Sequence, residues 1–75
     1  MKPINLRDAI EQVPFQPFVL EMDNGRSLRV PHRDFIFLTP AGSTAVVVER
    51  ASEGEHTHIV DVDHVSMIRF DKKAA

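Results

Sequence analysis

The chain has 75 residues, a formal net charge of −2 at neutral pH and no cysteine. This length predicts one small domain spanning residues 1–75, whose single core supplies only about 3–5 kcal/mol. The absence of cysteine excludes disulfides and thiolate metal sites, and it suits a reducing, cytoplasmic environment. The slightly acidic charge argues against a surface that is basic all round, as nucleic-acid-binding domains often have.

No apolar run approaches the ~20 residues that span a bilayer. The first ten residues also lack the apolar segment of a secretory signal. We therefore expect a cytoplasmic protein without membrane contact. A chain this small without disulfides gains stability most readily by self-association, so a homo-oligomer is expected.

A short helix is predicted over residues 5–13. Four apolar residues recur at the spacing of one helical face: Leu6, Ala9, Ile10 and Val13. Asn5 is a suitable N-cap and Asp8 suits the first turn, where the helix dipole favours an anion. Pro14 is expected to stop the helix, because the residue before a proline disfavours helical dihedrals.

Residues 18–70 are predicted to form antiparallel strands. The strands are expected over residues 18–22, 27–30, 34–39, 44–49, 56–62 and 65–70. Asp23-Asn24-Gly25-Arg26 joins the first two strands, and Asn-Gly favours a type I′ hairpin turn. Pro31 marks a break, because proline donates no ladder hydrogen bond. Residues 71–75 are expected to be a flexible tail.

These elements predict an α+β fold that is mostly β. One short N-terminal helix precedes a strongly bent five- or six-stranded antiparallel sheet, as in a barrel of the SH3 or Sm-like type. The fourth strand is apolar on both faces, across Ala45, Val46, Val47 and Val48. An oligomer interface at these residues explains the pattern; the alternative is that the helix covers the second face.

Several short motifs make the chain resemble a group of small bacterial proteins of unassigned function. The shared segments are Gln16-Pro17-Phe18, Asn24-Gly25, Val30 to Phe35, and Asp61 to Val65 followed by Ile68. This resemblance covers nearly the whole chain and implies no activity.

The layout also resembles the Sm-like family, which includes a bacterial RNA chaperone. Its first motif is similar to Leu20, Gly25, Leu28 and Asp34-Phe35. The resemblance implies a bent sheet closed into rings that bind RNA. The base-contacting Asn of that family has no counterpart, because Phe37 and Leu38 stand there.

One basic cluster offers a phosphate site. Its members are Arg26, Arg29, His32 and Arg33. Such side chains bind the phosphates that dominate nucleic-acid affinity. The alternative is a solvated strand face, balanced by Glu21 and Asp34.

The sequence His56-Thr57-His58 places two imidazoles on one strand face, because side chains alternate with period two. A third ligand from the Asp61, Asp63 and His64 group would complete a zinc or nickel site. The alternative is two exposed histidines on an edge strand.

No catalytic motif is present, and Asp61, Asp63, His64 and Ser66 favour a turn over an acid–base site. We therefore expect no enzyme activity, no cofactor and no small-molecule substrate. The predicted function is a small, non-enzymatic, oligomeric binding or assembly module. The alternatives are an Sm-like RNA-binding ring and a metal-binding protein.

Overall fold

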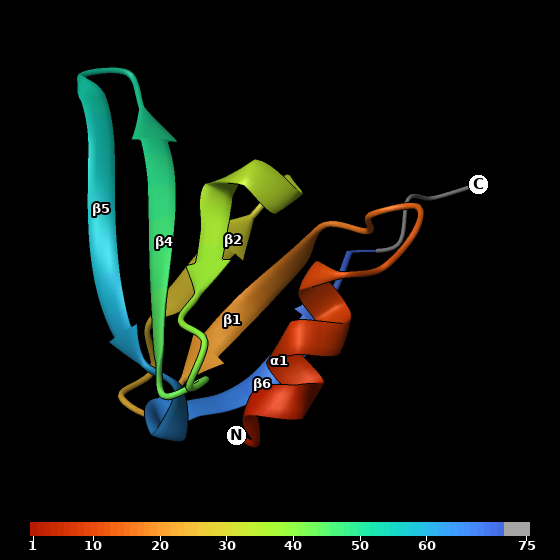
Figure 1. The fold of residues 1–75 in the computed structure, drawn as a ribbon. Coiled ribbons are helices and arrows are strands. Elements are labelled where there is room, and N and C mark those ends of the chain that lie inside the picture. The colour runs from red at the N-terminus through yellow and green to blue at the C-terminus, as the bar shows by residue number, and fades with distance from the viewer. Residues whose placement is uncertain (72–75) are drawn as a thin grey trace.

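The structure, a computed structural model, describes residues 1–71 as a helix followed by a mostly β domain (Figure 1). The elements are α1 (Pro3–Ile10), β1 (Phe18–Met22), β2 (Ser27–Val30), η1 (Arg33–Phe35), β3 (Ile36–Leu38), β4 (Thr44–Ala51), β5 (Gly54–Asp61), η2 (Val62–His64) and β6 (Val65–Phe70). The two η elements are single 3-10 turns. This arrangement confirms the predicted α+β class with strands dominating.

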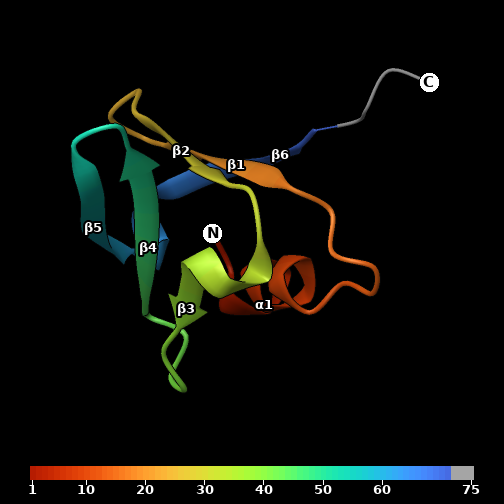
Figure 2. The ribbon, with the colours of Figure 1, turned by 90° about the horizontal axis from the view of Figure 1, so that it is seen from above.

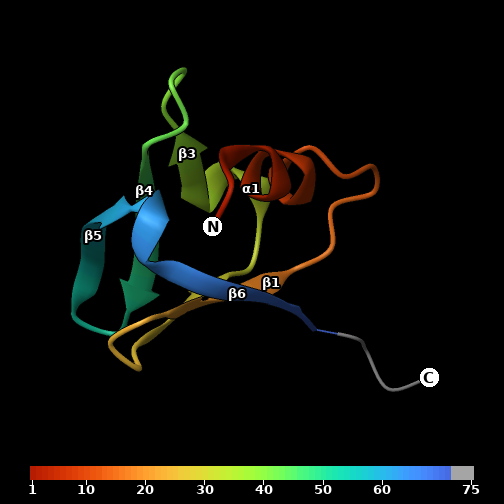
Figure 3. The ribbon, with the colours of Figure 1, turned by 90° about the horizontal axis from the view of Figure 1, so that it is seen from below.

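The strands form two three-stranded antiparallel sheets, with strand orders β2-β1-β6 and β3-β4-β5. The predicted single bent sheet is therefore two sheets, and within residues 1–71 they do not close into a barrel. The chain changes sheets at η1 and again at η2, where a 3-10 turn interrupts strand pairing. Figures 2 and 3 show the two sheets set at an angle, with α1 on their open side beside β3.

The core lies between the inward faces of the sheets and α1. Its largest fully buried side chains are Phe18, Leu6, Leu20, Val30, Val47, Val62 and Val65. Along β4 the burial alternates, with Ala45 and Val47 at 0% exposure and Val46 and Val48 only partly buried. This period of two is the strand alternation that places successive side chains on opposite faces.

The helix lies earlier in the chain than predicted. It begins at Pro3, where a proline at the first helical position loses no hydrogen bond. Lys2 occupies the N-cap, so Asn5 is inside the helix and Asp8 is outside the first turn. Leu6 and Ala9 are buried as expected, but the helix ends at Ile10 and Val13 is 90% exposed.

The hairpin between β1 and β2 is present, but its turn is not type I′. That turn needs positive φ at both central residues, and among residues 1–71 no residue except glycine has positive φ. Gly25 has φ +87°, and its N–H donates to the Met22 carbonyl at 3.0 Å. The Asn24 side chain instead accepts from the Arg26 N–H at 3.0 Å, which holds Asn24 in an ordinary turn conformation.

Two strand boundaries also differ. The predicted strand over residues 34–39 begins with η1 and is a strand only over Ile36–Leu38. The predicted loop before the fifth strand shrinks to a two-residue turn, because β4 extends to Ala51 and β5 begins at Gly54. Of the predicted flexible tail, residues 72–75 lie outside the described residues. Asp71 is anchored, since its N–H donates to the Pro17 carbonyl at 3.0 Å.

Replacing Gly42 with alanine is expected to destabilise the fold by at least about 1 kcal/mol more than the same change at Gly25. Both glycines have positive φ, +80° and +87°, so both substitutions carry the same backbone strain. Only at Gly42 does an added Cβ lie 2.5 Å from the Pro3 Cβ. Urea unfolding of Gly42→Ala and Gly25→Ala measures the difference, and equal losses contradict the proposed helix contact.

Candidate functional site

The outer face of the β3-β4-β5 sheet carries a row of exposed apolar side chains. Phe37 pairs with Val46, and Val46 pairs with Ile59, so the three residues are direct cross-strand neighbours. Phe37 is 60% exposed and Ile59 is 78% exposed. The neighbouring Val48 is half-buried on the same face. Large apolar side chains gathered in one place on a surface mark an interaction site, whereas single ones do not.

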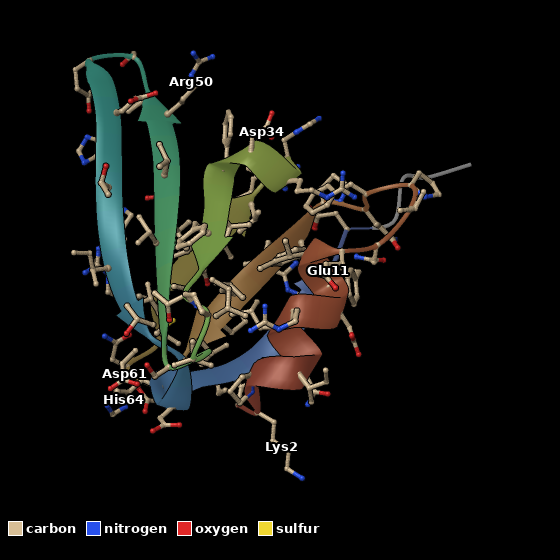
Figure 4. The ribbon with its side chains drawn as sticks, viewed as in Figure 1. Lys2, Glu11, Asp34, Arg50, Asp61 and His64 are labelled. Atoms are coloured by element: carbon tan, nitrogen blue, oxygen red, sulfur yellow. The ribbon has the colours of Figure 1, made fainter. Side chains whose placement is uncertain are left out.

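Polar pairs bound this apolar row at both ends of the sheet. Thr44 lies opposite Asp61 at one end, and Arg50 lies opposite Glu55 at the other. The Arg50 Nε is 4.0 Å from the Glu55 carboxylate, and its guanidinium carbon lies 5.9 Å from the centre of the Phe35 ring. Figure 4 shows Arg50 and Asp61 at opposite ends of the β4–β5 hairpin. An apolar centre with a polar rim is the usual composition of a protein–protein interface.

The four residues predicted as an oligomer interface divide between the two faces of β4. Ala45 and Val47 are fully buried in the core of the domain. Val46 and Val48 point to the outer face and are half-buried. The interface prediction therefore narrows to Val46 and Val48, and it gains Phe37 and Ile59 from the adjacent strands.

Arg33 of the predicted basic cluster is bound to the C-terminal end of α1. Its Nε donates to the Ile10 carbonyl at 2.9 Å, and a second guanidinium N–H donates to the Gln12 carbonyl. The same guanidinium lies 5.5 Å from the Phe15 ring centre. A cation is favourable here because the carbonyls that end a helix carry partial negative charge.

The other three residues of the basic cluster have different contacts from Arg33 and from one another. Arg29 forms an ion pair with Asp71. His32 Nδ1 lies 3.7 Å from the Asp34 carboxylate. For the Arg26 guanidinium, no partner is found among residues 1–71. Because Arg29 and Arg33 are already paired, the four residues do not form one cluster of free positive charges.

The two predicted metal ligands lie on the inward face of β5, where His58 is opposite Val47 and His56 is opposite Glu49. His58 Nε2 is 2.8 Å from Glu49 Oε1, and His56 Nε2 is 3.7 Å from the Glu53 carboxylate. Within the described part of the chain, no three His, Cys, Asp or Glu side chains are grouped to hold a metal ion. The contacts that His56 and His58 do make are pairings with glutamate.

A cluster of Asp23, Asp61 and His64 joins the β1–β2 turn to η2. The sequence analysis does not predict the contact between Asp23 and His64. His64 Nδ1 is 2.7 Å from Asp23 Oδ2, and the Asp23 N–H donates to the His64 carbonyl at 2.8 Å. His64 Nε2 also lies 3.9 Å from the Asp61 carboxylate; Figure 4 shows Asp61 and His64 close together. The two residues of the main pair are 41 positions apart in sequence, so no local pattern signals the contact.

These contacts raise the pKa of His64 above its ordinary value of 6.5. The hydrogen bond to Asp23 is the largest cause, followed by the charges of Asp23 and Asp61. The Ser66 hydroxyl, in contrast, donates to the Glu21 carbonyl at 3.0 Å. The Ser66 hydroxyl is therefore directed to a backbone carbonyl, and the contacts of His64 join η2 to the β1–β2 turn.

An open groove of about 390 Å³ lies beside this cluster, between the β1–β2 hairpin and the end of β5. Met22, Leu28 and Val60 provide its apolar lining, and Arg26, Asp61 and His64 are among its polar lining residues. The groove borders the last residues of β5.

Comparison of the chain with protein-family models, with curated proteins and with solved structures returns no match. In residues 1–71, no helix has the length and apolar character needed to cross a membrane.

Asp23→Asn is expected to lower stability most under mildly acidic conditions. Because the folded-state pKa of His64 is raised, its stabilisation is fully present below pH 6.5 and is lost as the pH rises through the folded-state pKa. The gap in unfolding midpoint between wild type and variant is therefore larger at pH 5.5 than at pH 9. Asp63→Asn is the control, because Asp63 has the weakest of these effects on His64. A gap that does not change with pH contradicts the assigned pairing.

Arg33→Ala is expected to cost on the order of 1 kcal/mol of unfolding free energy, because two backbone carbonyls near the helix end lose a charged donor. Arg26→Ala is the matched control and is expected to leave stability unchanged. Chemical unfolding of both variants measures the difference. Equal stabilities would mean that Arg33 is a solvated surface residue.

Proposed function

We propose that the protein is a non-enzymatic binding module that associates with itself, and that the outer face of the β3-β4-β5 sheet is its contact surface. The observation that carries this proposal is the row Phe37–Val46–Ile59. Burying the two most exposed members of the row removes large apolar areas from water, at roughly 25 cal/mol per Å².

The size of the chain supports the same proposal. A 75-residue domain without disulfides draws its stability from one small core. An eight-residue helix is the only helix among residues 1–71 longer than a single 3-10 turn, and it packs on the inward side of the sheets. The outer apolar row is therefore left for another molecule to cover.

An SH3-type or Sm-like architecture, and kinship with the small bacterial proteins that share its motifs, form part of the same proposal. The order of one helix followed by short antiparallel strands supports it. The RNA-binding alternative finds less support, because Arg29 and Arg33 already pair with groups of the chain itself. The metal alternative finds less support because His56 and His58 face glutamates and no described third ligand joins them.

Phe37→Ser is expected to weaken self-association about tenfold or more, because it removes a large aromatic side chain from the proposed contact surface. The side chain is 60% exposed, so folding is expected to survive the change. Light scattering coupled to size exclusion measures the mass against the 8.5 kDa of one chain.

Val13→Ser is the matched control for that experiment. Val13 is 90% exposed but lies on the segment after α1, away from the sheet face. Its loss is expected to leave the oligomer unchanged. A wild-type protein that remains at 8.5 kDa up to millimolar concentration would overturn the proposed function.

A further inference from the structure

Strand β5 is the longest strand at a sheet edge in the described structure. It has eight residues, and it pairs with β4 in an unbroken register from Gly54 to Asp61. In Figure 1 it is the outermost strand of its sheet. Natural proteins usually protect such edges with charged side chains, proline, bulges or short length. Strand β5 has no proline, lysine or bulge, and its acidic residues, Glu55 and Asp61, lie near its two ends.

The other edge strands are better protected. β3 has three residues, and β2 has four and is followed by Pro31. β6 has six residues and its pairing with β1 shifts register at Met22. Among the edge strands of residues 1–71, β5 is therefore the least protected.

The hydrogen-bond phase of the ladder shows which backbone groups point to this free edge. The Val62 N–H donates to the Ser43 carbonyl at 3.0 Å, which continues the β4–β5 register by one pair. Hydrogen-bonded pairs alternate with non-bonded pairs in an antiparallel ladder. The N–H and C=O groups of Thr57, Ile59 and Asp61 therefore point away from β4.

Space next to these residues is open. Beyond the strand ladders, no backbone hydrogen bond within residues 1–71 reaches Thr57 or Ile59. The groove of about 390 Å³ borders His58 to Asp61 and separates them from the β1–β2 hairpin. An added strand thus meets unpaired backbone groups and an uncovered edge.

We propose that a second copy of this chain adds to this edge, antiparallel, with Ile59 of each copy opposite Ile59 of the other. This inference rests on the proposed self-association and adds a second contact, at the sheet edge, to the contact through the outer face. The row Phe37–Val46–Ile59 ends at the free edge, and this register continues it into the same row of the second copy. A six-stranded sheet with one uninterrupted apolar row across its outer face results.

The match between opposing side chains favours this register over the other symmetric ones. If the two β5 strands paired with His58 opposite His58, Glu55 would lie opposite Asp61, and two directly opposed carboxylates are destabilising. Centring the pairing on Thr57 places His56 opposite His58 twice. Centring it on Val60 places Ile59 opposite Asp61.

With Ile59 at the centre, Thr57 lies opposite Asp61 and His58 lies opposite Val60. No like charges then face each other. Because Glu55 lies beyond the paired segment in this register, its amide is expected to remain free.

Amide hydrogen exchange, measured residue by residue at low and high protein concentration, tests the edge contact. The N–H groups of Thr57 and Ile59 are expected to slow about tenfold or more as the dimer forms. The Glu55 N–H is expected to show no such change, and the His58 N–H, which faces β4, is the internal control. A slowed Glu55 would indicate another register and contradict the Ile59-centred pairing.

Single-cysteine variants test the register independently, because the native chain has no cysteine. Opposite residues of a hydrogen-bonded pair have Cα atoms about 5.5 Å apart, within disulfide range. Ile59→Cys is therefore expected to form a covalent dimer under mild oxidation. Thr57→Cys, which is also at an exposed site, is expected to stay uncrosslinked because its copy lies about 14 Å away along the strands.

The outcomes separate this inference from the proposed function. A wild-type monomer at every concentration overturns both. An oligomer in which the Thr57 and Ile59 amides stay unprotected leaves self-association in place and overturns the edge pairing. Crosslinking of Thr57→Cys in preference to Ile59→Cys overturns the register.

Discussion

The packing of one short helix against two small sheets is the constraint on which the rest of this structure depends. An isolated helix of eight residues is not stable in water, so α1 exists only because the fold holds it. Leu6 and Ala9 bury its apolar face, and Arg33 binds the carbonyls at its end. At its start, Gly42 allows the β3–β4 turn to approach Pro3.

Because α1 packs on the inward side of the sheets, it covers the outer face of neither sheet. On the β2-β1-β6 sheet, Val19 is only 7% exposed and lies between Arg29 and Arg69. Both arginines reach the Asp71 carboxylate. Their long apolar stems are well suited to covering a central valine.

The β3-β4-β5 sheet also has a valine at the centre of its outer face, but the side chains beside this valine are apolar and exposed. Its central Val46 also lies between two cross-strand neighbours, but these are Phe37 and Ile59. Neither neighbour carries a charged end that pairs across the face. The contrast between the two sheets is the reason to assign the interaction surface to this one, and the free edge of β5 adjoins it.

Polar groups join two segments at one end of the molecule. Asp23 and His64 join the β1–β2 turn to η2 through one backbone and one side-chain contact. The pair closes the end of the fold near the groove and adds a pH-dependent contribution to stability. The neighbouring Ser66 hydroxyl donates to the Glu21 carbonyl.

Features that depend on neighbouring residues can be predicted from the amino-acid sequence. The alternation in β1 and β2, the turn at Gly25, the break at Pro31 and the mostly β class all follow from local pattern and were expected. The predicted helix start at Asn5 is wrong because Asn5 and Pro3 both suit a helix start. The start at Pro3 agrees with the burial of Leu6 and Ala9 and with the close approach of Gly42 to Pro3.

Which faces of the strands are covered depends on tertiary packing. The run Ala45–Val48 is apolar at every position, so sequence does not tell its core face from its outer face. Burial of Ala45 and Val47 settles that choice, and the cross-strand register then brings Phe37 and Ile59 beside Val46. Asp23 and His64 are likewise distant in sequence. Contacts of this kind depend on how strands pair and sheets pack, which local propensity does not encode.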